Sequence, residues 1–345
     1  TFETVKEPLE FVGLSFEKYE KPSEYRALSD MLRQKYNVYG GEAIVLQAER
    51  TGENVNGIIK SANSISVQKN YSDSLIVPYH AYYSRYNTIG AGSWENPGDA
   101  VKWRINVENE GLYTLSFKGR QSTNRGVTSY RRLYVNGVVP YEEANAIGFD
   151  YTNDMNNYTV CTADNEPMLF YLKAGENEIS LETVMGPFGG IITEVEASLK
   201  VLNTTYLHVI RLTGQSPSRY IDYQIDMKIP DFRESMRSEG ERLERIVEQI
   251  VAITGEKGEN TALLQKMAVE AKNLAEDPEH VIEELPQLKN NISAVGTWIV
   301  MVSAMPLELD SFIISGEGLR LPDAQASLLA GIKNGILRFF ASFFI

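Results

Sequence analysis

The spacing of apolar residues along the chain changes near Gly186, and this change says more about the fold than any other feature of the sequence. Before Gly186, apolar residues recur at every second position, as in 101–107 (VKWRINV) and 111–118 (GLYTLSFK). After it they recur at every third or fourth position, as in 243–251 (LERIVEQIV). A period of two is typical of half-buried strands, whereas a period near 3.6 is typical of amphipathic helices. The sequence therefore predicts a β part followed by an α part.

The β part is predicted to be a jelly-roll β-sandwich over residues 42–188. Turn-forming pairs such as Pro97-Gly98 and Asn136-Gly137 separate its short alternating segments, which is typical of antiparallel sandwiches. We expect strands within 42–49, 101–107, 111–118, 132–135, 168–172 and 177–182. An N-terminal extension over 1–41 precedes them and is expected to hold one helix, within 16–36.

The α part is predicted to be a bundle of antiparallel helices over residues 189–305. Its helices are expected from 191 onward and at 220–228, 230–254, 259–275 and 278–302, with Pro286 interrupting the last. Residues 306–345 are expected to form an extended segment and a C-terminal helix from Pro322, truncated at its end. The predicted fold class is thus multidomain β + α.

Composition excludes some partners. A net charge of −13 and a pI near 4.9 exclude nucleic acid, because such binding depends on basic residues that neutralise phosphates. The chain as a whole has no attraction for anionic lipid. No transmembrane segment is expected, and the apolar stretch 336–345 is too short to span a bilayer, so we interpret it as an amphipathic helix whose apolar face needs a partner.

No catalytic signature is found in the sequence. The three histidines, His80, His208 and His280, are far apart and have no metal-ligand spacing, and no nucleophile or phosphate-binding motif occurs. We therefore expect a protein that is not an enzyme. A glycoside hydrolase remains the catalytic alternative, because its two carboxylates need only meet in space. Candidate carboxylates for such a pair are Glu95, Asp99 and Asp154.

Aromatic residues suggest carbohydrate binding instead. Tyr83 and Tyr86, followed by Trp94, lie between predicted strands, and sugar rings stack their C–H faces on such side chains. The alternative is that these rings only cover an edge of the sandwich.

Polar residues in two further loops are candidates for bonding sugar hydroxyls. Arg120 and Asn124 flank or lie in one predicted loop, and Asn157 lies in another. Salt bridges to the protein's own acids are the alternative for Arg120, and an ordinary surface connection is the alternative for the loop of Asn157.

Several segments of the β part resemble carbohydrate-binding modules of the family 6 and family 35 type. They are 46–49 (LQAE), 96–103 (NPGDAVKW), 111–115 (GLYTL), 133–137 (LYVNG) and 172–179 (LKAGENEI). The resemblance implies binding of an oligo- or polysaccharide. It also implies a structural Ca²⁺ held by Gln47 and Glu49, although Gln47 replaces the first acid of the usual pair and Ala100 replaces an aromatic residue.

The order of a leading helix, a sandwich and a helical region resembles the N-terminal region of large extracellular solute-binding proteins of bacterial ABC transporters. This resemblance implies an extracellular or cell-surface-anchored bacterial protein in sugar transport, whose signal peptide precedes Thr1 and has been removed. Its partners would be a glycan, transporter components or further domains. The main alternative is a structural or protein-interaction module that binds no sugar.

Overall fold

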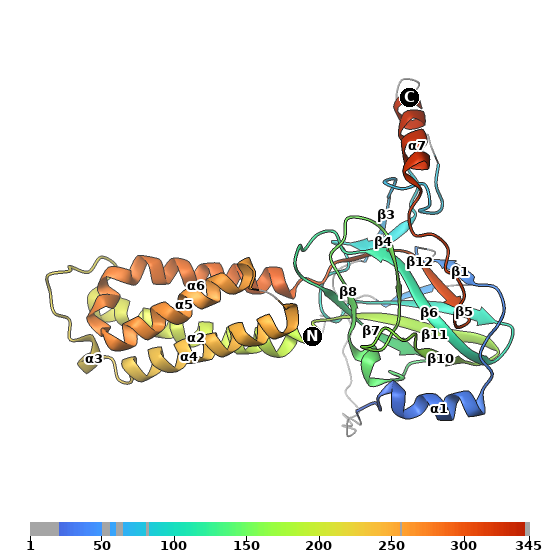
Figure 1. Cartoon of the computed structure of the whole chain (residues 1–345). Coiled ribbons are helices and arrows are strands. Elements are labelled where there is room, and N and C mark those ends of the chain that lie inside the picture. The colour runs from blue at the N-terminus through green and yellow to red at the C-terminus, as the bar shows by residue number, and fades with distance from the viewer. Residues whose placement is uncertain (1–20, 50–55, 60–64, 81–82, 256, 342–345) are drawn as a thin grey trace, which may run out of the picture.

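The computed structural model describes residues 21–49, 56–59, 65–80, 83–255 and 257–341. Figure 1 shows a β-sandwich, a helical bundle that extends to one side of it, and helix α7 projecting from it in another direction. The predicted fold class, a β-sandwich combined with a helical bundle, is confirmed.

The sandwich consists of two antiparallel sheets. The first contains β10 (Leu169–Leu172), β6 (Gly111–Arg120), β12 (Leu307–Ser315), β4 (Thr88–Ala91) and β3 (Val67–Gln68), with β1 (Ile44–Gln47) on β12 and β9 (Asn156–Thr159) on β6. The second contains β2 (Asn56–Ile59), β5 (Ala100–Val107), β11 (Gly175–Val184), β7 (Ser129–Val135) and β8 (Ile147–Phe149).

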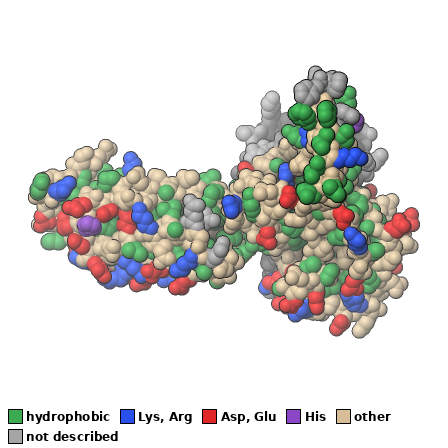
Figure 2. All heavy atoms as spheres, turned by 45° about the horizontal axis from the view of Figure 1, so that its top comes forward, with side chains coloured by type: hydrophobic (Ala, Val, Ile, Leu, Met, Phe, Trp, Pro, Cys, Tyr) green, Lys and Arg blue, Asp and Glu red, His purple; other side chains and the backbone are tan. Residues whose placement is uncertain are grey.

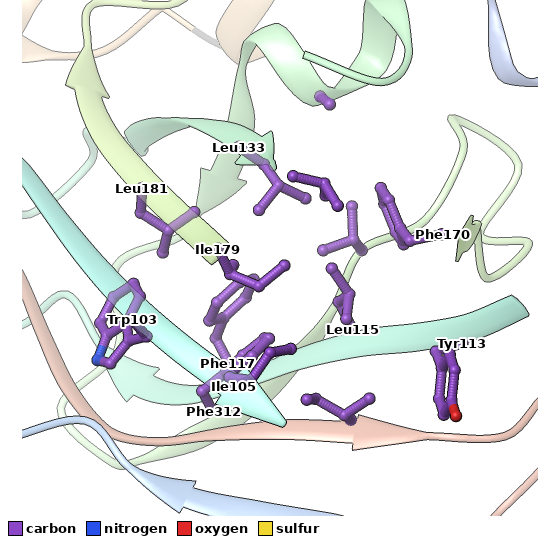
Figure 3. Close-up of a cluster of buried hydrophobic side chains, with 14 of the residues drawn as sticks. Trp103, Ile105, Tyr113, Leu115, Phe117, Leu133, Phe170, Ile179, Leu181 and Phe312 are labelled. Atoms are coloured by element: carbon purple, nitrogen blue, oxygen red, sulfur yellow. The ribbon is translucent and has the colours of Figure 1, made fainter. Parts of the chain in front are cut away.

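The core between the sheets follows from the alternation in the sequence. Along β5, Val101, Trp103, Ile105 and Val107 are buried while the residues between them are not. Figure 3 shows Trp103 and Ile105 meeting Phe117 of β6 and Phe312 of β12 inside the sandwich. The rings of Phe117 and Phe312 stack with centroids 5.0 Å apart.

The bundle forms a second, separate core. Its helices are α2 (Phe188–Thr213), α4 (Phe232–Thr254), α5 (Glu259–Glu276) and α6 (Val281–Ser303), with the short α3 (Ile225–Lys228) in the connection from α2 to α4. In α4, Leu243, Ile246, Val247 and Ile250 are buried, as their helical spacing predicts. The expected interruption at Pro286 is wrong, because α6 continues through it while Leu285 and Leu288 beside it pack into the core.

Strand β12 corrects the predicted division of the chain. Residues 306–345 were expected to be separate from the sandwich, yet β12 pairs with β6, β4 and β1 in the first sheet. Every residue of β12 is buried. The bundle is therefore an insertion between β11 and β12, and the sandwich is completed by a strand that follows the bundle in sequence. Short-range periodicity cannot show which strands pair when more than a hundred residues separate them.

The two terminal helices are shorter than expected. Helix α1 (Tyr25–Lys35) begins where the carboxylate of Glu143 accepts a hydrogen bond from the Tyr25 backbone N–H, which satisfies a donor at the helix start. Residues 16–20 of the predicted helix lie outside the described residues. Helix α7 (Leu328–Ala341) begins six residues after Pro322. No helix among the described residues is long and apolar enough to cross a membrane.

Phe312 tests the dependence of the sandwich on β12. We expect Phe312→Ala to lower the free energy of unfolding by about 3–5 kcal/mol, since it removes a fully buried ring and leaves a cavity between the sheets. Val138→Ala, at an exposed position, should change it by less than about 0.5 kcal/mol. Urea unfolding followed by tryptophan fluorescence measures both, and equal effects of the two substitutions would contradict the central role of β12.

Candidate functional site

Exposed aromatic residues gather on the connection between β3 and β4, residues 69–87, which we call the tyrosine loop. Tyr83 is 65% exposed and Tyr86 is 58% exposed, and Tyr71 also faces solvent. Large aromatic side chains normally lose most of their exposed area on folding, so rings left in water on one loop mark a surface that can take a ligand.

The tyrosine loop is closed at its base by a pair of asparagines. The Asn87 side chain donates to the backbone oxygen of Asn70 at 2.6 Å and of Pro78 at 3.2 Å, and its Oδ1 accepts from the Asn70 N–H at 2.8 Å. Both asparagines are buried. Fully satisfied polar groups of this kind hold a loop in one conformation.

Glu308 of β12 anchors the tyrosine loop to the sheet through hydrogen bonds. Its Oε1 accepts hydrogen bonds at 2.8 Å from Asn70 Nδ2 and from Thr88 Oγ1, and its Oε2 accepts one at 2.8 Å from Arg120 Nε. Three donors therefore converge on one buried carboxylate. Hydrogen bonds to an ionised acceptor are about twice as strong as neutral ones.

Asp310, two residues further along β12, fixes the middle of the loop. Its carboxylate lies 2.7 Å from Lys118 Nζ and accepts from the Val77 N–H at 3.2 Å. Burial raises the pKa of Asp310, and the ammonium group of Lys118 opposes that rise. Lys118 also donates to the backbone oxygen of Leu75, so both partners bind the loop.

The two exposed tyrosines are oriented by neighbours of their own loop. Lys69 Nζ lies 4.7 Å from the ring centroid of Tyr86, and the rings of His80 and Tyr83 are 4.9 Å apart. The site therefore offers aromatic rings on an anchored support. Exposed rings on a fixed loop are the geometry that stacking on a flat ligand requires.

Trp94, predicted to be part of the sugar platform, is fully buried. Its Nε1 donates to the backbone oxygen of Asp99 at 3.3 Å, and the guanidinium of Arg131 lies 4.4 Å from its ring. Its prediction as a binding residue is wrong, because no face of the indole reaches solvent. Trp103 is buried as expected.

Two of the three predicted polar residues are engaged at the sandwich surface. Arg120 pairs with Glu308 and also donates to the backbone oxygen of Asn153 at 2.9 Å, which agrees with the salt-bridge alternative. The Asn157 side chain donates to the backbone oxygen of Pro322 at 2.7 Å, on the segment between β12 and α7. Both side chains therefore donate hydrogen bonds to the protein itself.

Asn124 lies at the junction with the bundle. Its side chain donates to the backbone oxygens of Met301 and Ala304, at 3.2 and 2.9 Å, and so satisfies carbonyl groups at the end of α6. Arg131 donates nearby to the backbone oxygens of Trp94 and Met305, both at 2.8 Å. Asn124 is thus a positioning residue for the bundle, and its prediction as a sugar ligand is not supported by these contacts.

The residues expected to hold calcium fit it only in part. Gln47 Oε1 is buried and accepts no hydrogen bond from the described residues, and Glu49 is buried beside it in sequence. Calcium requires six to eight oxygen ligands. No group of three His, Cys, Asp or Glu side chains suited to a metal occurs in the described part of the chain, so these two residues do not by themselves make a calcium site.

One member of the alternative carboxylate set is inaccessible. Asp99 is fully buried, and burial raises the pKa of its carboxyl group. A carboxyl group without access to solvent cannot meet a sugar substrate. A glycosidase pair that includes Asp99 is therefore excluded.

Comparison with known proteins identifies the bundle. Residues 190–300, about a third of the chain, match the family described as bacterial solute-binding protein, 4-helix bundle domain. A search of curated protein sequences returns no match. The bundle part of the expected resemblance is thus confirmed by a family match, and the two antiparallel sheets confirm a sandwich.

Solved structures similar to the sandwich include carbohydrate-binding modules. A family 35 module from Clostridium thermocellum is 16% identical over 42% of this chain and 88% of its own, with a TM-score of 0.29. The family 35 module of Cellvibrio japonicus Abf62 is 16% identical over 41% of this chain and 83% of its own, with a TM-score of 0.26. The match to the Podospora anserina GH26-CBM35 β-(1,4)-mannanase covers 42% of this chain but 25% of that enzyme, with 14% identity and a TM-score of 0.28.

Glu308 provides the test of how the loop is anchored. We expect Glu308→Ala to lower the free energy of unfolding by about 3 kcal/mol, because it leaves two buried donors and the half-buried Arg120 without their acceptor. Amide hydrogen exchange in the tyrosine loop should rise at the same time. Glu317→Ala breaks a more exposed ion pair with Arg33 and should cost less than about 1 kcal/mol. Unchanged exchange in the loop of the Glu308 variant would refute the anchoring.

Proposed function

We propose that this chain is a non-catalytic, extracellular carbohydrate-binding region of a solute-binding protein that serves a sugar-importing ABC transporter. The observation that supports it most directly is the pair of exposed rings, Tyr83 and Tyr86, on a loop fixed to a β-sandwich. The family match of the bundle supports the link to solute binding.

Stacking is the mechanism that these residues favour. A pyranose ring presents a flat C–H face, and two tyrosines three residues apart offer two contact surfaces to neighbouring units of an oligosaccharide. The anchoring hydrogen bonds of Asn70, Asn87 and Glu308 lower the entropic cost of ordering the loop when the ligand arrives. The expected ligand is therefore an oligo- or polysaccharide.

The second candidate is a structural or protein-interaction module that binds no sugar. The hydrogen bonds of Arg120, Asn124 and Asn157 favour it, because each of these side chains donates to the protein itself. On this reading the tyrosine loop and the bundle would contact other proteins or further domains.

Substitution of the two tyrosines tests the proposal. Tyr83→Ala and Tyr86→Ala should each weaken binding of an oligosaccharide found on a glycan array by about tenfold, since each removes one stacking contact. Tyr220→Ala, which removes an exposed ring at the far end of the bundle, should leave affinity unchanged. Isothermal titration calorimetry is the appropriate measurement, because Trp94, Trp103 and Trp298 are all buried and their fluorescence would report little.

Two results would contradict the proposal. Absence of binding across a broad array would favour the protein-interaction module. Turnover of a chromogenic glycoside, lost when one carboxylate is neutralised, would favour a glycoside hydrolase.

A further inference from the structure

Helix α7 presents its apolar face to solvent. Leu328, Leu329, Ile332, Ile336 and Phe340 fall on one side of the helix by their spacing, and their exposed fractions run from 51% at Ile336 to 81% at Leu328. A surface helix normally buries this side. Figure 2 shows the resulting concentration of hydrophobic side chains on the projecting part of the molecule.

The opposite, polar side of α7 faces the protein. Ala330, Asn334 and Arg338, spaced by four residues, are the half-buried positions of the helix. The guanidinium of Arg338 lies 4.0 Å from the Tyr71 ring and donates to the Tyr71 backbone oxygen at 2.8 Å. Just before the helix, the Ala326 N–H donates to Asp73 Oδ2 at 2.8 Å. The tyrosine loop therefore holds α7 with its apolar side turned outward.

Helix α7 and the residues just before it carry positive charge only. Residues 324–341 contain Lys333 and Arg338 and no acid, although the chain as a whole carries a net charge of −13. By its spacing, Lys333 lies at the border of the apolar side. Apolar residues that include Phe, bordered by a cation and free of acids, are the features of a helix that lies in the surface of an anionic membrane.

We propose that α7 docks on an anionic lipid surface, with Leu329, Ile332, Ile336 and Phe340 inserted among the lipids and Lys333 at the headgroups. An anionic surface repels the acidic remainder of the chain. Figure 1 shows that α7 projects from the sandwich, so the helix can reach such a surface first. The fourteen described residues of α7 are too few to span a bilayer, so the proposal places this helix in the membrane surface. This inference is independent of glycan binding.

A second copy of the chain fits this face less well. Fourteen residues of helix are about 21 Å long, so a stripe of ordinary width would bury roughly 200 Å² on each copy. A stable interface buries about 800 Å² per partner. Two α7 helices would also bring cations together with no acid on either helix to pair with them.

Vesicle co-sedimentation of the full chain tests the proposal. Binding should be about fivefold stronger to phosphatidylcholine vesicles containing phosphatidylglycerol than to phosphatidylcholine alone, because Lys333 is the cation placed at the headgroups, and it should weaken with added salt. The double variant Ile332→Glu, Ile336→Glu should lose at least about tenfold in affinity. A matched double variant, Leu207→Glu with Val300→Glu, places the same charges at exposed apolar positions of the bundle and should bind as the parent does.

Separate outcomes overturn the proposal. Failure to bind either vesicle, with α7 shown to be folded by circular dichroism, would reject it. A dimer seen by light scattering and abolished by the Ile332→Glu, Ile336→Glu change would show that a second copy covers the face. Tyr83→Ala should retain vesicle binding, so loss of glycan binding leaves this proposal standing.

Discussion

Without the pairing of β12 in the first sheet, neither the sandwich nor the anchoring of the tyrosine loop could form. This strand lies between β6 and β4 and also carries β1, so four of the seven strands of that sheet meet through it. Because it follows the bundle in sequence, the sandwich is complete only when the chain has passed through the bundle and returned. The large sequence separation makes this pairing entropically costly, and the burial of Phe312 and its neighbours repays that cost.

The same strand connects the fold to the proposed site. Its inward residues, Leu309 and Phe312, pack in the core, while Glu308 and Asp310 bind the tyrosine loop from the other side of the sheet. Alternation along β12, with an irregularity between Leu309 and Ser311, therefore puts the core residues and the loop-binding residues on opposite faces. Tyr83 and Tyr86 are exposed, and the loop that carries them is attached to the sheet by the hydrogen bonds of Glu308 and Asp310.

Polar contacts join the two parts, and one of the residues that make them is fully buried. Arg131 is fully buried, and desolvation lowers the pKa of its guanidinium to about 9, an effect that Asp99 opposes. Its hydrogen bonds to Trp94 and Met305, together with those of Asn124 to the end of α6, attach the exit of the bundle to the sandwich. This deep charge is stabilised by the backbone oxygens of Tyr130, Trp94 and Met305, which accept hydrogen bonds from Nη1 and Nη2.

Residues a few positions apart are enough to predict the change from strands to helices near Gly186, the inward side of β5 and the buried stripe of α4. The sequence also proposed Tyr83 and Tyr86 as candidate binding residues, although it did not predict the hydrogen bonds that hold their loop. The folded structure was needed to show that Trp94 is core, that Asn124 bonds to the end of the bundle and that β12 completes the sandwich. Those outcomes depend on pairings between distant segments, and local periodicity carries no information about which distant segments meet.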